Sequence, residues 1–195
     1  VVDVPAESQV HQQMVRKEAE IHDIEINPLV RLYYVEVQEP DMHDPSGDLR
    51  RLLNALEADW QLLNLSYDVA LLSTIQPILR AGKWGVTVAV RQGEQIVALW
   101  PGLKDAVYGV AVDVGSTTIA AHLCNLSSGE ILASSGAMNP QIRFGEDLMS
   151  RVSYVMMNPG GEVDMTNAVR ESLNGLVKDL VKQAECEVTD LLEIT

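Results

Sequence analysis

The sequence predicts a mixed α/β protein built from two small modules. Two observations support this: segments with strand-like alternation occur on both sides of residues 101–106, and each side also carries leucines at helical spacing. A chain of 195 residues is long enough for one domain or two small ones. Hydrophobic residues make up 47% and charged residues 22%, which is typical of a folded chain.

The first module is predicted over residues 29–103, after a linker or extended arm at 1–28. "LVRLYYVEVQEP" alternates as a strand does, and the helix that follows carries an apolar stripe at Leu49, Leu52, Leu53, Leu56 and Trp60. A second helix is predicted over 67–82, with Pro77 as a kink or break. "WGVTVAV" and "QIVALWPG" then form a hairpin with Gly93 in its turn.

The second module is predicted over residues 106–195. "VYGVAVDV", "IAAHLCNL" and "ILASSGAM" read as three strands of an antiparallel meander, joined by the turns "GSTT" and "SSGE". Helices are expected at about 145–156 and 163–185, and "LLEIT" resembles the approach to another strand. These elements leave one sheet edge open, so the module looks unfinished.

Charge and composition exclude several classes of partner. Fourteen basic and 28 acidic side chains give a net charge of -14, so we expect neither a nucleic-acid partner nor a membrane surface. The first residues do not form a signal peptide, and no apolar run is long enough to span a bilayer. Cys124 and Cys186 are too few for a disulfide framework or a four-cysteine metal site. We therefore expect a reduced, cytoplasmic protein.

The turn after the first strand of the meander is the strongest candidate for chemistry. Gly115 allows a ligand oxygen to approach the main chain, and Ser116, Thr117 and Thr118 add hydroxyl groups beside the turn amides. Asp113 is placed to hold a magnesium ion or its water shell next to a phosphate. The alternative is a tight hairpin turn in which these residues serve only turn geometry.

Two longer stretches carry a family resemblance. "YGVAVDVGSTTIAAHLCNLSSGEIL" resembles the first phosphate motif of the ASKHA superfamily, whose members share an RNase-H-like fold. "ASSGAMNPQIRFGEDLMSRVSY" resembles the reductive activators of corrinoid proteins. In that family a ferredoxin-like domain with a 2Fe-2S cluster precedes a linker, a middle domain and an ASKHA domain. The resemblance implies a linker at 1–28, an α+β middle domain at 29–103 and a partial RNase-H-like ASKHA domain at 106–195.

The resemblance also implies a function. Such activators use ATP to return the cobalt of a corrinoid protein from Co(II) to Co(I). ATP and Mg²⁺ would bind a partial site here, the 2Fe-2S cluster would lie outside this chain, and a corrinoid protein of a methyltransferase system would be the partner. We expect the parent protein to be an ATPase coupled to electron transfer and this fragment to be inactive alone. The alternative is a module for protein interaction or homodimerisation without catalytic activity.

The resemblance assigns roles to individual residues. Asp113 would organise Mg²⁺ through water, and Gly115, Ser116, Thr117 and Thr118 would bind phosphate. Asp113 and Asp147 are expected to be catalytic, with Asp147 or Glu146 positioning a water. For Asp147 and Glu146 the alternative is the acidic first turn of a helix. Matches without an assigned role are Asn139, Gln141, Gly145 and Arg151.

Other residues have structural explanations. Asp44 or Ser46 is predicted to cap the first helix, because the aspartates around His43 lack the spacing of a calcium loop. The three tryptophans are expected to pack the first module. The methionines of the second module, Met138, Met149, Met156 and Met157, are predicted to fill its core.

Overall fold

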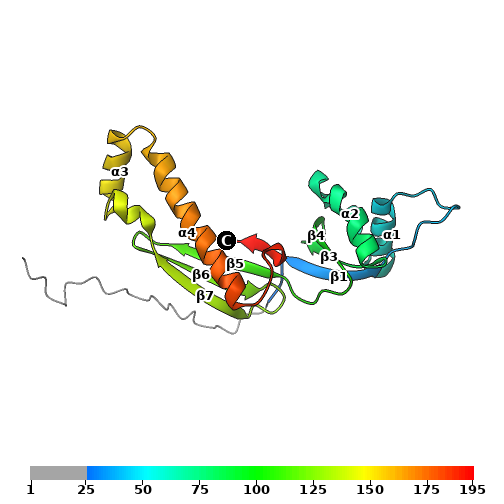
Figure 1. Cartoon of the computed structure of the whole chain (residues 1–195). Coiled ribbons are helices and arrows are strands. Elements are labelled where there is room, and N and C mark those ends of the chain that lie inside the picture. Colours follow the sequence, from blue (N-terminus) through cyan, green and yellow to red (C-terminus); the bar gives the residue numbers. More distant parts are fainter. Residues whose placement is uncertain (1–25) are drawn as a thin grey trace, which may run out of the picture.

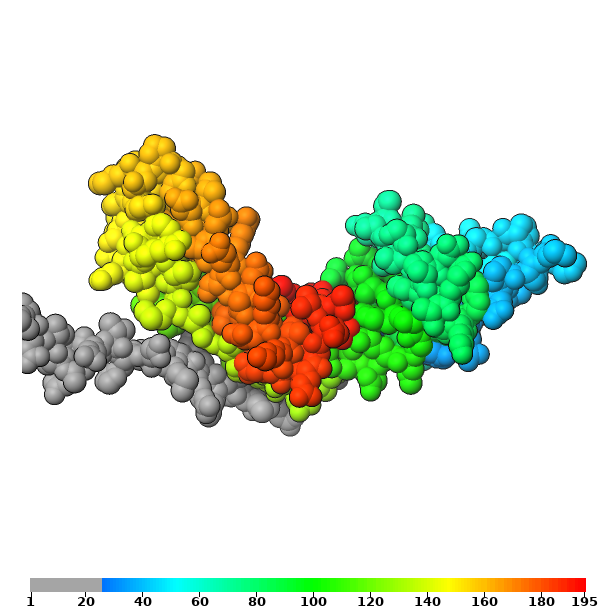
Figure 2. All heavy atoms as spheres, in the orientation of Figure 1, coloured from blue at the N-terminus to red at the C-terminus, as the bar shows by residue number. Residues whose placement is uncertain are grey.

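A computed structural model describes residues 26–195, so the arm expected at 1–28 lies almost entirely outside the described residues. Figure 1 shows two modules in succession, each with helices on one face of a four-stranded sheet. In the space-filling view of Figure 2 they form two lobes that meet at a narrow junction. The mixed α/β class predicted from the sequence is confirmed.

The sheet of the first module has the strand order β1-β3-β4-β2. Strand β1 (Val30–Glu36) pairs antiparallel with β3 (Gly85–Arg91), which pairs antiparallel with β4 (Gln95–Pro101). Gln92 and Gly93 both have positive φ (53° and 74°), as the tight turn of the predicted hairpin requires. Strand β2 (Ser66–Tyr67) lies parallel to β4 at the edge. The sequence did not predict it, because two residues carry no periodicity.

Helices α1 (Asp48–Trp60) and α2 (Val69–Ala81) supply the core of this module. Leu52 and Leu56 of α1 and Ile75 and Leu79 of α2 are fully buried against β3 and β4 residues. Pro77 lies within α2, so a break at this position was wrong. The proline ring faces solvent on the exposed side of the helix, while Ile75 and Leu79 hold the opposite face to the core.

Two further predictions for the first module need correction. The residue that precedes α1 is Gly47, with no side-chain cap, and the Asp44 carboxylate instead accepts the Ser46 N–H at 2.9 Å. Trp84 packs partly against the core, as predicted. Trp60 is only partly covered, at 48% exposed, but its ring packs edge-on against Tyr33 and its indole N–H donates to the Tyr34 carbonyl at 2.9 Å.

The second module has the strand order β7-β6-β5-β8. Strands β5 (Tyr108–Val114), β6 (Thr118–Asn125) and β7 (Ile131–Met138) form the predicted antiparallel meander. The strand expected near the end of the chain is β8 (Leu191–Ile194), which follows the 3-10 helix η3 (Val188–Asp190) and runs parallel to β5. Strand β7 remains an open edge within the described residues.

Helix α4 (Gly161–Gln183) covers one face of this sheet (Figure 1). Its Leu176 and Leu180 are buried against side chains from the strands, namely Val110, Ile119, Ala121, Leu123 and Ala133. Helix α3 (Leu148–Met157) begins later than predicted, because residues Pro140–Phe144 form the 3-10 helix η2 and the chain is extended at Gly145 and Asp147.

The methionine prediction was wrong. Met138, Met149, Met156 and Met157 are 55%, 70%, 81% and 78% exposed. The one fully buried residue of α3 is Arg151, Tyr154 and Val155 are half-buried, and the other apolar side chains of this helix face outward. Helical spacing identifies an apolar face but does not reveal whether another layer covers it.

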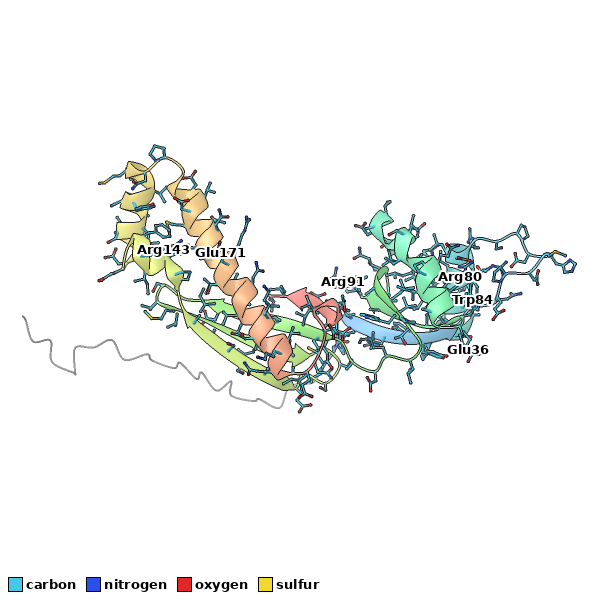
Figure 3. All side chains as sticks on the ribbon, in the orientation of Figure 1. Glu36, Arg80, Trp84, Arg91, Arg143 and Glu171 are labelled. Atoms are coloured by element: carbon cyan, nitrogen blue, oxygen red, sulfur yellow. The ribbon has the colours of Figure 1, made fainter. Side chains whose placement is uncertain are left out.

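The junction between the modules is held by two ion pairs to the end of the chain. The Arg91 guanidinium contacts the Glu193 carboxylate at 2.8 Å, and Lys104 Nζ contacts Asp190 Oδ1 at 2.8 Å. Figure 3 shows Arg91 beside β8, where the two lobes meet. No helix in residues 26–195 combines the length and apolarity that crossing a bilayer demands.

Candidate phosphate-binding site

The predicted phosphate turn is the connection between β5 and β6. Val114 and Ile119 are the last paired residues of the two strands, and the Gly115 N–H donates to the Thr118 carbonyl at 2.9 Å. Ser116 and Thr117 are exposed at the tip. The structure therefore brings together all the residues predicted to bind phosphate.

Glycine at position 115 is required by space. A Cβ atom built there would lie 2.8 Å from the Thr118 carbonyl oxygen, closer than side-chain carbons approach a main-chain oxygen. The φ angle of Gly115 is not in the left-handed region, so the close approach, and not a positive φ, excludes other residues. A larger residue would force the turn open.

Three successive carbonyl groups of the turn point toward the connection between β7 and α3. Asn139 Nδ2 donates to the Gly115 carbonyl at 2.8 Å, and the Asn139 N–H donates to the Thr117 carbonyl at 2.8 Å. Between them, Arg151 Nη2 donates to the Ser116 carbonyl. In a trans peptide the C=O and the following N–H point in opposite directions. The amides that follow these carbonyls therefore face away from the connection.

The outward amides of Ser116 and Thr117 are the candidate donors to a ligand. Within residues 26–195, neither N–H group has a main-chain acceptor. Consecutive main-chain N–H groups that point to one side form an anion-binding concavity. This arrangement fits a phosphate group, with the nearby hydroxyl groups as additional donors.

Asn139 has two roles in this arrangement. The side chain is 2% exposed, and its Oδ1 accepts the Gln141 N–H at 2.9 Å, which caps η2. Its Nδ2 is then directed at the Gly115 carbonyl. One side chain thus starts a helix and fixes the turn.

Arg151 is 5% exposed and links three segments. Besides Ser116, its guanidinium donates to the Gly145 carbonyl at 2.9 Å and to Gln141 Oε1 at 3.4 Å. Gln141 Nε2 in turn donates to the Met165 carbonyl of α4 at 3.3 Å. All the hydrogen-bond acceptors of Arg151 are neutral oxygens, and the described part of the chain gives it no ion pair.

The two predicted catalytic carboxylates lie in different surroundings. Asp113 is exposed near the end of β5, opposite Ala120 of β6 and two residues from Gly115. Asp147 precedes α3, and its Oδ1 accepts the Ser150 N–H at 2.7 Å. That main-chain hydrogen bond, together with one from the Ser150 side chain, lowers the pKa of Asp147. Asp147 is therefore the N-cap of α3 and does not lie in its first turn, where the sequence alternative had placed it.

The residues fit a nucleotide phosphate better than a metal cluster. No group of three or more His, Cys, Asp or Glu side chains suited to a metal occurs in the described ranges. A magnesium ion bound to a nucleotide takes most of its ligands from phosphate and water, which is compatible with one carboxylate at Asp113. Cys124 and Cys186 are free, and burial raises the pKa of both thiols. These two thiols do not fit a 2Fe-2S cluster, which needs four thiolate ligands.

Comparisons with known proteins cover both modules. Residues 19–106 match the family described as the RACo linker region, and residues 108–195 match the RACo middle region. A solved structure titled "Reductive activator for corrinoid,iron-sulfur protein" aligns with 89% of this chain at 31% identity, with a TM-score of 0.71. The chain belongs to the family of reductive activators of corrinoid proteins.

A curated relative supports the same assignment. The corrinoid activation enzyme RamQ of Eubacterium limosum is 30% identical over 87 residues, which are 45% of this chain. This chain covers 15% of RamQ and 28% of the solved activator. The family descriptions use the term linker for 19–106 and middle for 108–195, whereas the resemblance led us to use middle domain for 29–103 and ASKHA domain for 106–195.

Sequence reasoning on this activator segment matched Asn139 and Arg151 to a family stretch but gave them no role. The Asn-Pro pair at 139–140 signals a turn and a helix cap, which the structure shows. Nothing local to Arg151 signals burial, because an arginine within a helix ordinarily faces solvent.

Proposed function

We propose that this chain is part of an ATP-dependent reductive activator that returns the cobalt of a corrinoid protein from Co(II) to Co(I). The electron would come from a 2Fe-2S ferredoxin domain outside this chain, and the corrinoid protein would belong to a methyltransferase system. The observation that carries the proposal is the likeness to a solved reductive activator over 89% of this chain. A cytoplasmic location is proposed with it, since both cysteines are free thiols.

In this proposal the β5–β6 turn of a partial ASKHA domain holds a phosphate of ATP. The amides of Ser116 and Thr117 and the hydroxyl of Thr118 would donate to phosphate oxygens, and Gly115 would let them approach. Asp113 would orient the water shell of Mg²⁺. ATP would supply the free energy for an electron transfer that is otherwise unfavourable. This coupling requires conformational states of the protein that bind ATP with different affinities.

Asp113 provides the test of the proposed nucleotide role. In the complete activator, Asp113→Ala is expected to lower ATP hydrolysis by about a hundredfold, because a metal clamp contributes several kcal/mol. Formation of Co(I), followed by its absorbance, should fall in parallel. The control is Asp59→Ala, which removes an exposed carboxylate from α1. Unchanged ATP hydrolysis by Asp113→Ala would show that Asp113 does not organise the metal.

Asp147 is proposed to position the attacking water in addition to capping α3. Asp147→Asn keeps the oxygen that accepts the Ser150 N–H, whereas Asp147→Ala removes it. A catalytic carboxylate predicts that both variants lose at least tenfold in ATP hydrolysis. If Asp147→Asn retains full activity, the residue is a cap alone.

The alternative function, a module for docking or homodimerisation, is favoured by one observation. Apolar side chains at the α2 end of the first module are exposed, namely Leu63, Tyr67, Val69 and Leu72. Residues 29–103 would then retain a corrinoid protein in a pull-down, or associate with a second copy in light scattering. Val69→Asp should abolish either association while Ser73→Asp does not. No association at concentrations where the complete activator associates would exclude this role.

A further inference from the structure

The conformation of the phosphate turn is determined by two buried side chains outside it. We infer that Asn139 and Arg151 are positioning residues: they hold the turn carbonyls inward, so that the turn amides face the phosphate, and the buried charge of Arg151 is complemented by that anion. This inference rests on the proposed nucleotide role of the turn.

Asn139 fixes the two ends of the turn. Its side chain holds the Gly115 carbonyl and its main chain holds the Thr117 carbonyl, both at 2.8 Å. Without the first bond, the peptide between Gly115 and Ser116 is free to rotate, and the Ser116 N–H loses its direction. The side chain itself is prevented from moving because its oxygen is bound to the Gln141 N–H.

Arg151 fixes the middle of the turn. The guanidinium is planar and presents its N–H groups in a rigid fork. Here one arm holds the Ser116 carbonyl and the Nε–H holds the Gly145 carbonyl, so the turn is tied to the start of α3. A hydrogen bond to a carbonyl polarises its peptide unit, which makes the N–H of the same unit a stronger donor. The strengthened donor is the Thr117 N–H, which faces the proposed phosphate.

The charge of Arg151 supports a bound anion. Burying a charge is unfavourable unless an opposite charge compensates it. Arg51, the other buried arginine among the described residues, has such a partner in Asp44 at 2.8 Å. In the described part of the chain the guanidinium of Arg151 donates only to neutral oxygens, and the Asp147 carboxylate, which acts on it electrostatically, forms no ion pair with it. A phosphate on the turn would lie one peptide unit away and would supply a negative charge that Asp147, bound to Ser150, does not bring into an ion pair.

The test compares nucleotides with and without phosphate on the complete activator. Calorimetry would give the affinity for Mg-ATP and for adenosine in the wild type and in Arg151→Gln, Arg151→Lys and Asn139→Ser. The serine variant keeps an oxygen for the cap but removes Nδ2. We expect each variant to bind Mg-ATP about tenfold more weakly, the effect of one lost charge-assisted or buried hydrogen bond, and adenosine as wild type does.

Arg143→Gln is the matched control. It removes a cation from the same connection, but Arg143, labelled in Figure 3, is exposed. Its guanidinium lies over the Phe144 ring, 4.7 Å from the centroid. The affinity of this variant for Mg-ATP should stay within about twofold of wild type, as expected for an exposed charge. An equal loss in Arg143→Gln would mean that net charge, and not positioning, controls the affinity.

The outcomes separate this inference from the proposed function. If the wild type does not bind Mg-ATP, the proposed function is wrong and the inference falls with it. If the wild type binds and the variants bind equally well, the turn is a nucleotide site but Asn139 and Arg151 do not position it. Equal losses of ATP and adenosine would show a general structural role and would also overturn the inference. If Arg151→Gln does not fold, Arg151→Lys provides the test, because it keeps the positive charge and loses the planar guanidinium fork.

Discussion

The two modules each contain one buried arginine that fixes a connection, and the two arginines differ in how their charge is balanced. Arg51 is 3% exposed and Arg151 is 5% exposed. Arg51 donates to three main-chain carbonyls between β1 and α1, those of Glu39, Asp44 and Ser46. Arg151 donates to the Ser116 and Gly145 carbonyls.

The difference lies in the carboxylate. The Asp44 carboxylate contacts the Arg51 guanidinium at 2.8 Å, so the positive charge of Arg51 is paired within its own connection. Asp147 lies close enough to feel the charge of Arg151, but it is bound to Ser150 and forms no ion pair with the arginine among the described residues. The arginine of the first module thus has a carboxylate partner, whereas that of the second leaves positive charge without an ion pair beside an exposed turn.

The largest expected effect is on the stability of the first module. Arg51→Met should lower its free energy of unfolding by about 3 kcal/mol, because three partly buried carbonyl groups and the Asp44 carboxylate lose their donor. All three tryptophans lie in this module, so urea unfolding followed by tryptophan fluorescence reports on it. Arg50→Met, at an exposed neighbouring position, is the control. Identical midpoints for the two variants would contradict a structural role for Arg51.

Arg151 should show a smaller effect that depends on ligand. At a fixed, saturating concentration of Mg-ATP, Arg151→Gln of the complete activator should gain about 1.4 kcal/mol less stability from the nucleotide than the wild type, as a tenfold weaker affinity requires. Thermal melting with and without Mg-ATP measures the difference. Equal stabilisation of both proteins would remove the contrast between the two arginines.

Acid should affect the first connection through Asp44. Hydrogen bonds from the Ser46 side chain and main chain, with a smaller contribution from Arg51, lower the pKa of Asp44 below its ordinary 3.8. The unfolded chain therefore binds this proton more readily, so the stability that Asp44 contributes is present above about pH 4 and is lost as the pH falls through the lowered pKa. Asp44→Asn should reduce the loss of stability below pH 4 in urea titrations. An unchanged acid profile would show that the carboxylate contributes nothing.

The ion pairs at the junction between the modules should contribute least to the free energy of unfolding. Arg91 and Glu193 are both partly exposed, and exposed ion pairs contribute up to about 1 kcal/mol. Arg91→Gln should therefore shift the unfolding free energy by less than about 1 kcal/mol, and the shift should shrink at high salt. Arg31→Gln, at an exposed position of β1, is the control. A loss comparable to that of Arg51→Met would mean that the junction is as important as the buried connection.

The sequence predicted the elements that carry their own local signal. Alternating residues and turn residues such as Gly93 located the strands, and leucine spacing located α1 and α4. Strand β2 and the 3-10 helix η2 are too short for periodicity, and both are formed by contacts with distant residues. Thus the Ser66 N–H donates to the Glu94 carbonyl at 2.8 Å, and Asn139 caps η2 while bound to Gly115.

The site was predictable in part for the same reason. The glycine and hydroxyl residues of the β5–β6 turn are adjacent in the chain, so their pattern is visible. The support from Arg151 comes from 35 residues beyond Ser116 and depends on how α3 is placed against the turn. The exposed methionines show the same limit, since the spacing of apolar residues does not specify which face of α3 is turned inward.

The most direct test is a structure of the complete activator with magnesium and a non-hydrolysable ATP analogue. We expect a phosphate oxygen about 3 Å from the amide nitrogen of Ser116 or Thr117, with Asn139 and Arg151 still bound to the turn carbonyls. Phosphates bound elsewhere in the protein, with the β5–β6 turn empty or covered by another segment, would contradict this prediction.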